Sequence, residues 1–240
     1  MREVNAYDRR PVRVAEFFAG SRSIGREAEA LGMDVFSVDN NPKFKGIHLL
    51  ADMEFVRPHD LPWAPDIIWA SPPCTTYSLA AISYHREPDG TPRTDFAAKC
   101  DRLVQNTIAL INAFPNAIFY MENPRATLRN MPFMAALPKP VTVWYCRYGD
   151  KRAKPTDIWT NNLQTLFNPT GWRPRPECWN SNPGCRHERA ERGSRTGTQG
   201  LKNAYERSKI PAALCREALL SAVDLRPKAP ALRYHDQHQP

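Results

Sequence analysis

The sequence predicts an α/β fold in which a mainly parallel sheet is flanked by helices. Short runs of β-branched and aromatic residues alternate with helix-like segments from residue 12 to about residue 160, which is typical of βαβ units. The 240 residues, 42% of them hydrophobic, suit one globular domain with a modest insertion and exclude a chain that is disordered throughout. No segment approaches the ~20 consecutive apolar residues that span a bilayer, so we expect no membrane partner.

Each predicted strand ends at a polar or small residue. We expect strands at Val12–Ala19, Asp34–Asp39, His48–Asp52, Asp66–Ser71 and Ala117–Glu122. Ligands of open α/β sheets collect in a crevice at the carboxyl ends of the strands. The side chains expected to converge there are those of Glu16, Asp39, Asp52, Cys74 and Glu122.

Helical periodicity marks two further segments. Phe96–Phe114 carries apolar residues at helical spacing, which indicates a helix that faces the core. Ser208–Val223 has a similar pattern, with Pro211 in its first turn, where a missing N–H is tolerated. Two strands, Val141–Tyr148 and Thr156–Thr160, follow each other without a long helix between them and predict an antiparallel hairpin at the sheet edge.

The positive charge is concentrated in one third of the chain. The formal net charge is +8, and residues 147–216 hold 14 Lys and Arg against 6 Asp and Glu, whereas the remainder holds 19 of each sign. A localised basic surface is typical of a protein that binds a polyanion, because Lys and Arg release the counterions condensed on phosphates. The alternative is a solvated basic face. The charge alone therefore leaves a nucleic-acid partner and a solvated basic face equally open.

The six cysteines are scattered, and the first residues contain no apolar run that would form a signal peptide. We therefore expect a reducing, cytoplasmic environment. Cys178, Cys185 and His187 fall within ten residues and form a candidate set of ligands for a structural zinc ion, with Cys146 as a candidate fourth ligand. Free thiols beside a surface histidine are the alternative that we favour from the spacing, so no metal is assigned.

A cofactor signal lies where the first strand turns into a helix. The segment AEFFAGSRSIG places glycines at this turn, and an acid, Asp39, follows about 20 residues later at the end of the second strand. An acid at that position accepts hydrogen bonds from ribose hydroxyls. With Gly20 and Gly25 alone, the turn lacks the GxGxxG pattern, which favours a smaller adenosine ligand over a dinucleotide.

A nucleophile signal follows the fourth predicted strand. In the segment ASPPC the two prolines fix the backbone and present Cys74 at the mouth of the crevice. The segment YMENP closes the next strand and delivers Glu122 to the same crevice. A chance Pro-Pro-Cys triplet in a loop is the alternative, but a thiol and an acid beside an adenosine ligand define a reaction class.

These motifs resemble those of the DNA cytosine C5-methyltransferases, especially the short forms common in bacteriophages. The resemblance covers residues 12–161 and about 200–224 and rests on FFAGSRSIG, SVDNN, LLADM, SPPC, MENP and CRYGDKRAKPTDIWTN, in the order of the family. It implies a Rossmann-like sheet that binds S-adenosylmethionine. The implied domains are a catalytic domain (1–161), a small irregular target-recognition insertion (162–200), a returning helix (201–225) and a flexible tail (226–240).

The resemblance also implies the roles of the catalytic residues. Cys74 would attack C6 of a flipped cytosine, and Glu122 would protonate or hydrogen-bond N3, so that C5 can take a methyl group. Asn123 would hold the active-site loops, and Lys154 would replace a family arginine near the base. Thr156 stands where a second family arginine is usual, which is a departure from the pattern.

For the cofactor, the resemblance implies contacts along three segments. Phe18 would contact the adenine or sulfonium region, Asp39 would bind the ribose, and Asp52 would accept from the adenine amine. Arg22 stands where a second glycine is usual, and we expect it to pair with the methionine carboxylate. The full predicted cofactor set is Phe18, Ala19, Gly20, Ser21, Arg22, Ser23, Asp39, Asn40, Asp52, Met53 and Pro73.

For the substrate, the expected partner is double-stranded DNA bound by a monomer. The loop after Cys74 would close over the DNA, as mobile catalytic loops do, with Ser78 and Arg93 contacting phosphates. The arginines of the insertion would read bases and bind the backbone. They are Arg186, Arg189, Arg192 and Arg195.

Three alternatives stay open at this point. The same chemistry could act on RNA, or use a modified donor or a modified cytosine, and the unusual Arg22 is compatible with that alternative. A DNA-binding protein that keeps the fold without catalysis is the second, against which the intact Cys74 and Glu122 argue. A base amino-methyltransferase is the third, but that chemistry uses an aromatic residue after the Pro-Pro pair.

Overall fold

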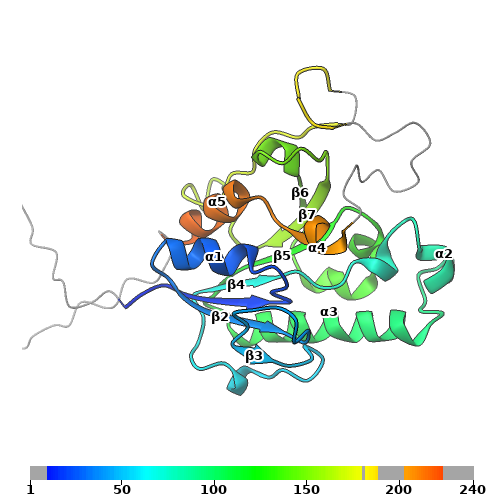
Figure 1. Cartoon of the computed structure of the whole chain (residues 1–240), viewed down its shortest axis with the longest axis horizontal. Coiled ribbons are helices and arrows are strands. Elements are labelled where there is room, and N and C mark those ends of the chain that lie inside the picture. Colours follow the sequence, from blue (N-terminus) through cyan, green and yellow to red (C-terminus); the bar gives the residue numbers. More distant parts are fainter. Residues whose placement is uncertain (1–9, 180–181, 189–202, 224–240) are drawn as a thin grey trace, which may run out of the picture.

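The computed structural model describes residues 10–179, 182–188 and 203–223 (Figure 1). Within these residues a seven-stranded sheet has the order β3-β2-β1-β4-β5-β7-β6. The neighbouring pairs from β3 to β5 are parallel, and β7 is antiparallel to both β5 and β6. The strands are β1 (Arg13–Phe17), β2 (Asp34–Asp39), β3 (Leu49–Leu50), β4 (Ile67–Ala70), β5 (Ile118–Pro124), β6 (Val141–Trp144) and β7 (Pro155–Thr160).

The α/β prediction is confirmed, and the five parallel strands lie where the sequence pattern places them. The antiparallel hairpin is also confirmed, but its second strand, β7, lies inside the sheet and β6 forms the edge. The strand expected at Val141–Tyr148 is too long, because the pairing with β7 ends at Trp144 and Pro155. The chain then forms a 3-10 helix, η6 (Tyr145–Tyr148), which turns Tyr145 into the interior.

Helices cover both faces of the sheet. Figure 1 shows α1 (Ser23–Ala30) and α5 (Ala212–Val223) on one face, and α3 (Asp95–Ala113) on the other. Successive side chains of β4 point to opposite faces of the sheet. Ile68 therefore packs in the cluster of α3, whereas Trp69 packs in the cluster of α1 and α5. The α3 prediction is correct to one residue at each end, and Thr94 caps this helix by accepting from the Ala97 amide at 3.2 Å.

The predicted helix at Ser208–Val223 begins four residues later in the structure, as α5, and ends at the same residue. A short helix, α4 (Ala204–Ser208), is followed by extended backbone at Lys209, and α5 begins only at Ala212. Pro211 therefore precedes α5, and its carbonyl accepts from the Cys215 amide at 3.1 Å. The break places residues 207–210 over the carboxyl ends of the strands.

Residues 162–179 and 182–188 of the insertion contain no helix or strand beyond isolated bridges. Part of this segment packs into the apolar cluster of α1 and α5. Trp172 is buried with its ring centroid 5.8 Å from that of Tyr120, and the Arg175 amide donates to the Tyr148 hydroxyl at 2.9 Å. Among the helices that the structure describes, none is long and apolar enough to cross a membrane.

Candidate active site

A cleft of about 380 Å³ lies at the carboxyl ends of β1, β4 and β5. Its volume falls in the range of roughly 300–1,000 Å³ that is usual for small-molecule sites. The cleft joins the loop after β1, the segment after β4, the end of β5, the turn before β7 and residues 207–210. Its polar and ionisable lining residues are Glu16, Ser21, Ser23, Ser71, Cys74, Thr75, Glu122, Arg152, Lys154, Arg207 and Ser208.

Cys74 lies in the wall of the cleft and is half-buried. Pro72 and Pro73 precede it, and a short 3-10 helix (Thr75–Tyr77) starts immediately after it. Burial raises the pKa of the Cys74 thiol, the Lys154 ammonium opposes this rise, and the Glu122 carboxylate adds to it. The thiol therefore carries its proton at neutral pH in the free protein.

Asn123 connects the end of β5 with the segment that holds Cys74. Its side chain is fully buried, and Nδ2 donates to the Pro72 carbonyl at 2.9 Å. Its Oδ1 is buried without a hydrogen-bond partner among the described residues. This amide fixes the distance between two cleft walls.

Glu122 is buried at the end of β5, and two groups from the hairpin approach the same oxygen. The Tyr145 hydroxyl donates to Oε1 at 2.9 Å, and the Lys154 ammonium lies 3.8 Å from Oε1. The Lys154 Nζ also lies 4.6 Å from the centroid of the Tyr145 ring. Burial and the neighbouring Glu122 raise the pKa of Tyr145 well above its usual value, so the hydroxyl stays protonated and acts as a donor.

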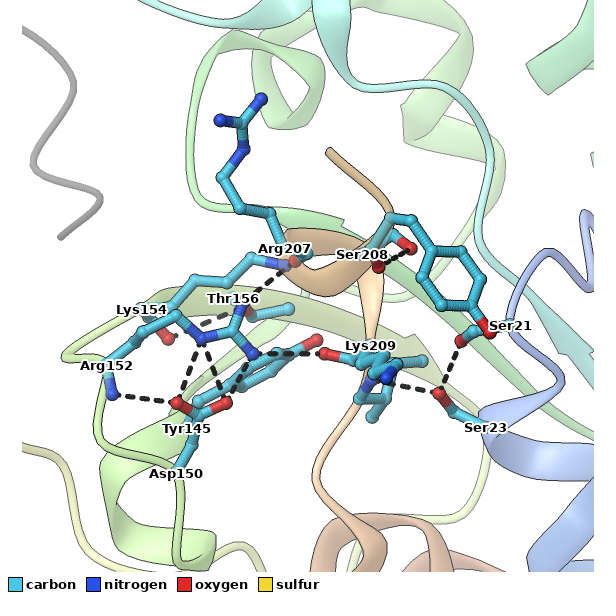
Figure 2. A network of polar contacts seen from close by, with 12 residues as sticks. Ser21, Ser23, Tyr145, Asp150, Arg152, Lys154, Thr156, Arg207, Ser208 and Lys209 are labelled. Carbon is cyan, nitrogen blue, oxygen red and sulfur yellow. Dashed lines mark hydrogen bonds and ion pairs between the residues drawn. The ribbon is translucent and has the colours of Figure 1, made fainter. Parts of the chain in front are cut away.

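Arg152 ties the turn before β7 to the returning segment (Figure 2). Its guanidinium pairs with Asp150 and donates to the carbonyls of Arg207 at 2.9 Å and Lys209 at 3.2 Å. One residue further on, the Ile210 amide donates to the Ser23 hydroxyl at 3.1 Å. These contacts close the cleft on the side opposite the sheet.

The loop after β1 has a strained backbone. Phe18, Gly20 and Arg22 all adopt left-handed conformations, with φ of 56°, 46° and 53°. Such conformations cost free energy in residues other than glycine and cluster at functional sites. Phe18, Ala19, Gly20, Ser21 and Ser23 line the cleft, as does Pro73 on the opposite wall.

Arg22 lies away from the cleft, which corrects the expected pairing with a cofactor carboxylate. Its buried Nε donates to the Ser37 hydroxyl at 3.1 Å, and its Nη2 donates to Glu29 Oε1 at 2.5 Å. The guanidinium also lies 4.0 Å from Glu16 Oε2. Because these groups already satisfy the charge, we no longer assign Arg22 to the cofactor.

The packing of Glu16 and Arg22 requires a glycine at position 25. A Cβ atom at this position would lie 2.6 Å from Glu16 Oε2 and 2.9 Å from Arg22 Nη2. The glycine therefore admits two charged side chains over the start of α1, and its role is to allow their packing. Burial raises the pKa of Glu16, whereas hydrogen bonds from the Gly25 amide and Ser37 oppose the rise.

Asp39 and Asn40 do not line the cleft. Asp39 is buried, and its two oxygens accept from the Gly20 amide at 2.9 Å and the Asn41 amide at 2.8 Å. The carboxylate thus holds the loop after β1 against β2. Each oxygen retains a lone pair that can accept from a further donor, so the ribose contact stays a prediction.

Asp52 and Met53 also lie outside the cleft lining. Lys99 donates to Asp52 Oδ2 at 2.6 Å, and Met53 is buried in the cluster of α3. Burial acts to raise the pKa of Asp52, but the hydrogen bonds from Lys99 and the Glu54 amide outweigh it and hold the pKa below its usual value. Five side chains are expected to converge at the carboxyl ends of the strands. Glu16, Cys74 and Glu122 line the cleft there, whereas Asp39 and Asp52 do not.

Arg86 anchors the loop after Cys74, together with Tyr77, whose carbonyl accepts from the Thr127 hydroxyl at 2.8 Å. Arg86 is buried and donates to Asp101 at 2.7 and 3.1 Å and to the Thr76 carbonyl at 3.0 Å. The predicted phosphate contacts have partners within the loop, since the Ser78 hydroxyl accepts from the Ala80 amide and Arg93 pairs with Glu87. The Ser78 hydroxyl still has a proton to donate, so the phosphate contacts stay predictions.

Of the four arginines expected to face DNA, Arg186 is exposed. Arg189, Arg192 and Arg195 lie outside the described residues, as does the predicted tail. The candidate zinc ligands Cys146, Cys178, Cys185 and His187 do not line the cleft. They gather in a cluster beside η6, where all four ligand atoms lie within 4.8 Å of one another.

For Arg152 and Arg207, which line the cleft, the sequence predicts only a place in the basic region. For Tyr145, which does not line the cleft but donates to Glu122, it predicts only a strand residue. Arg152 and Arg207 carried no local signal, because their contacts join segments 55 residues apart.

No protein-family model matches the sequence, and no curated protein matches it. Solved structures do match. The methyltransferase EhMeth of Entamoeba histolytica aligns with a TM-score of 0.51 at 14% identity, over 71% of this chain and 58% of that chain. This likeness and the observed strand order define the α/β Rossmann-like methyltransferase fold.

Two further matches have lower scores. A protein described as a DNA modification methyltransferase encoded within a prophage of E. coli aligns with a TM-score of 0.47 at 15% identity, over 62% of this chain and 46% of that chain. The Dnmt2 methyltransferase of S. pombe aligns with a TM-score of 0.44 at 10% identity, over 69% of this chain and 57% of that chain. The chain thus spans about half the length of the solved structures it matches.

Proposed function

We propose that the protein is an S-adenosylmethionine-dependent methyltransferase that modifies C5 of cytosine in double-stranded DNA. The observation that carries the proposal is that Cys74 and Glu122 line one cleft with the loop after β1, in a methyltransferase fold. A thiol and a carboxyl on facing walls are the two groups that activation of cytosine C5 requires. The monomeric state and the cytoplasmic location stay predictions.

The loop after β1 fits the cofactor. Phe18, Ser21 and Ser23 present an aromatic ring and two hydroxyls at the start of α1, where the helix dipole favours a carboxylate. When bound, S-adenosylmethionine supplies an electrophilic methyl group. The strained backbone at Phe18 supports a ligand-binding role for this loop.

Cys74 supplies the nucleophile in the proposed reaction. Its sulfur forms a bond to C6, and the π electrons of the C5–C6 bond move by conjugation to N3, which takes a proton. The enamine carbon C5 then takes the methyl group, while the donor sulfur keeps the electron pair of the broken S–CH3 bond. Solvent takes up the C5 proton as the C5–C6 double bond re-forms and the Cys74 thiolate departs, and N3 gives back its proton, which restores the aromatic base. Because the thiol pKa is raised, the thiol must lose its proton as attack occurs.

Glu122 stabilises the charge that attack creates on the ring. Its carboxyl would share a proton with cytosine N3, so that the ring accepts electrons without building up a full negative charge. The Tyr145 hydroxyl and Lys154 both hold Oε1, which leaves Oε2 for the base. Neither C5 nor C6 is reachable inside a stacked duplex, so the base must be flipped into the cleft.

The charge distribution supports a nucleic-acid substrate. Arg207 and Lys154 bring positive charge to the cleft, and the basic excess of the chain falls in residues 147–216. Phosphate contacts by such a surface supply affinity but no base sequence, so the target sequence depends on other contacts.

Nucleoside mass spectrometry tests the proposal. Unmethylated duplex DNA and a matched RNA are incubated with the protein and S-adenosylmethionine, with Cys74→Ala as the comparison and Cys100→Ala as the control for a buried thiol outside the cleft. We expect 5-methyl-2′-deoxycytidine from the wild type and from the control, and none from Cys74→Ala. If methylated cytosine forms in the RNA alone, the substrate is RNA. If product still forms with Cys74→Ala, the mechanism does not use a covalent bond to Cys74.

A further inference from the structure

We propose that Cys146, Cys178, Cys185 and His187 bind a structural zinc ion that fastens the insertion to the hairpin of β6 and β7. Each residue offers one ligand atom, and the four atoms lie within 4.8 Å of one another. Three sulfurs and one imidazole nitrogen form a ligand set that is common in structural zinc sites. The set is complete, which leaves no open position for substrate.

The spacing of the ligand atoms fits a tetrahedral ion. Zinc–sulfur bonds of about 2.3 Å and zinc–nitrogen bonds of about 2.0–2.1 Å, held at the tetrahedral angle, would separate a sulfur from a nitrogen by about 3.6 Å. The Cys178 Sγ lies 3.7 Å from the His187 Nδ1. This contact is too long for a strong hydrogen bond but matches the edge of a coordination tetrahedron.

The surroundings of the sulfurs support deprotonated ligands. The Asn182 Nδ2 donates to the Cys178 Sγ at 3.3 Å. Amide donors aimed at sulfur stabilise a thiolate and orient it toward a metal. Cys178 and His187 are buried, whereas Cys146 and Cys185 are half-buried, so the cluster lies just below the surface.

The region around the four ligands buries few apolar side chains of its own. Its apolar cluster has three buried members, Trp144, Ala153 and Cys178, and the residues of the insertion contain no helix or strand in the described ranges. Small irregular segments with so little apolar burial are commonly held by a metal or by disulfides. The cysteines of the cluster form no disulfide, which leaves a metal as the cross-link that this cluster provides.

The ion would join segments that are far apart in sequence. Cys146 belongs to η6, next to Tyr145, whereas the other three ligands belong to the insertion. Beside the cluster, the Glu188 amide donates to the Lys151 carbonyl at 2.6 Å. Zinc binding therefore stabilises the arrangement of η6 and the turn before β7, independently of the reaction that the cleft performs.

Metal analysis of the purified full chain tests the proposal directly. After purification under reducing conditions without chelator, we expect about one zinc ion per chain in the wild type. Cys178→Ser and Cys146→Ser should each lower the content to less than about a tenth of that value. The control is Cys215→Ala, which removes a buried thiol in α5 outside the cluster and should leave the zinc content unchanged.

A variant that fails to fold would lose its metal whether or not the mutated residue is a ligand. Cobalt substitution of the wild type therefore provides a second test. Cobalt(II) bound to the wild type should show the d–d bands of a tetrahedral site and thiolate-to-cobalt charge-transfer absorption. A wild-type chain that contains no zinc and gives no such bands would overturn the proposal, as would variants that retain the metal. A disulfide among Cys146, Cys178 and Cys185, found by non-reducing peptide mass spectrometry of the freshly purified protein, would also overturn it. Each readout is independent of methyl transfer.

Discussion

The two halves of the sheet share one apolar core, but the hairpin half adds polar contacts to the returning segment. The parallel half, from β3 to β5, is stabilised by apolar side chains packed against helices on both faces. The hairpin half, with β6, η6 and β7, also packs apolar side chains such as Val143, Ile158 and Trp159 into these clusters, and it adds polar contacts from Arg152 and Tyr145. Both halves contribute to the cleft. The contacts that hold Glu122 and the returning segment are therefore made in addition to a shared apolar core.

The largest expected effect comes from removing a buried side chain of the parallel half. Ile68→Ala should lower the free energy of unfolding by about 2–5 kcal/mol, because Ile68 is fully buried beneath α3. Urea denaturation measures the change. Leu50→Ala, at a site that is 56% exposed, serves as the control and should change stability by less than about 0.5 kcal/mol. Equal effects of the two substitutions would contradict an apolar origin of stability in this half.

A smaller and more local effect is expected in the hairpin half. Arg152→Met removes a guanidinium that holds Asp150 and two backbone carbonyls, and should destabilise this region by about 1.5–3 kcal/mol. Hydrogen exchange should become faster in residues 141–160 and 203–211. Exchange in α3 should stay unchanged, and uniform acceleration over the whole chain would show that the two halves do not differ.

Tyr145→Phe tests the contact between the halves at the level of activity. Loss of the hydroxyl that donates to Glu122 should slow single-turnover methyl transfer about tenfold, equivalent to about 1.4 kcal/mol of barrier. Tyr148→Phe is the matched control, since that hydroxyl accepts from the Arg175 amide. The assignment would fail if both substitutions slowed the reaction equally.

The smallest effect concerns the charge of Lys154. Its ammonium opposes the rise in the pKa of Cys74, so Lys154→Met should raise this pKa further and make alkylation of Cys74 by iodoacetamide several-fold slower at pH 8. In the wild type, the rate should still rise with pH through pH 9, because the thiol pKa lies above its usual value. Peptide mass spectrometry separates Cys74 from the other cysteines.

Lys99→Met is the control for that experiment. Lys99 pairs with Asp52 outside the cleft, and its replacement should leave the alkylation profile of Cys74 unchanged. Faster alkylation in Lys154→Met would contradict the electrostatic role of the ammonium.

The sequence predicts the position of an element well where a local run of apolar residues defines it. The positions of β1, β2, β4 and β5 follow from short apolar runs that end at polar residues, and α3 follows from its periodicity. The motifs around Cys74 and Glu122 lie directly at strand ends, so topology alone brings them to one cleft.

The sequence was less informative where contacts are long-range and polar. Nothing local shows that Arg22 turns toward Glu29 and Ser37, because α1 and β2 meet only in the folded sheet. The end of β6 at Trp144 depends on pairing with Pro155, which the pattern of apolar residues does not encode. The predicted domain boundaries and the roles in binding cofactor and DNA stay predictions.

The bonds from Arg152 to the carbonyls of Arg207 and Lys209 have a consequence for synthesis of the chain. During translation the strands up to β7 can pair before residue 207 has left the ribosome. The wall of the cleft formed by residues 207–210 cannot. A nascent chain therefore carries Cys74 and Glu122 in an incomplete cleft, which is closed only late in its synthesis.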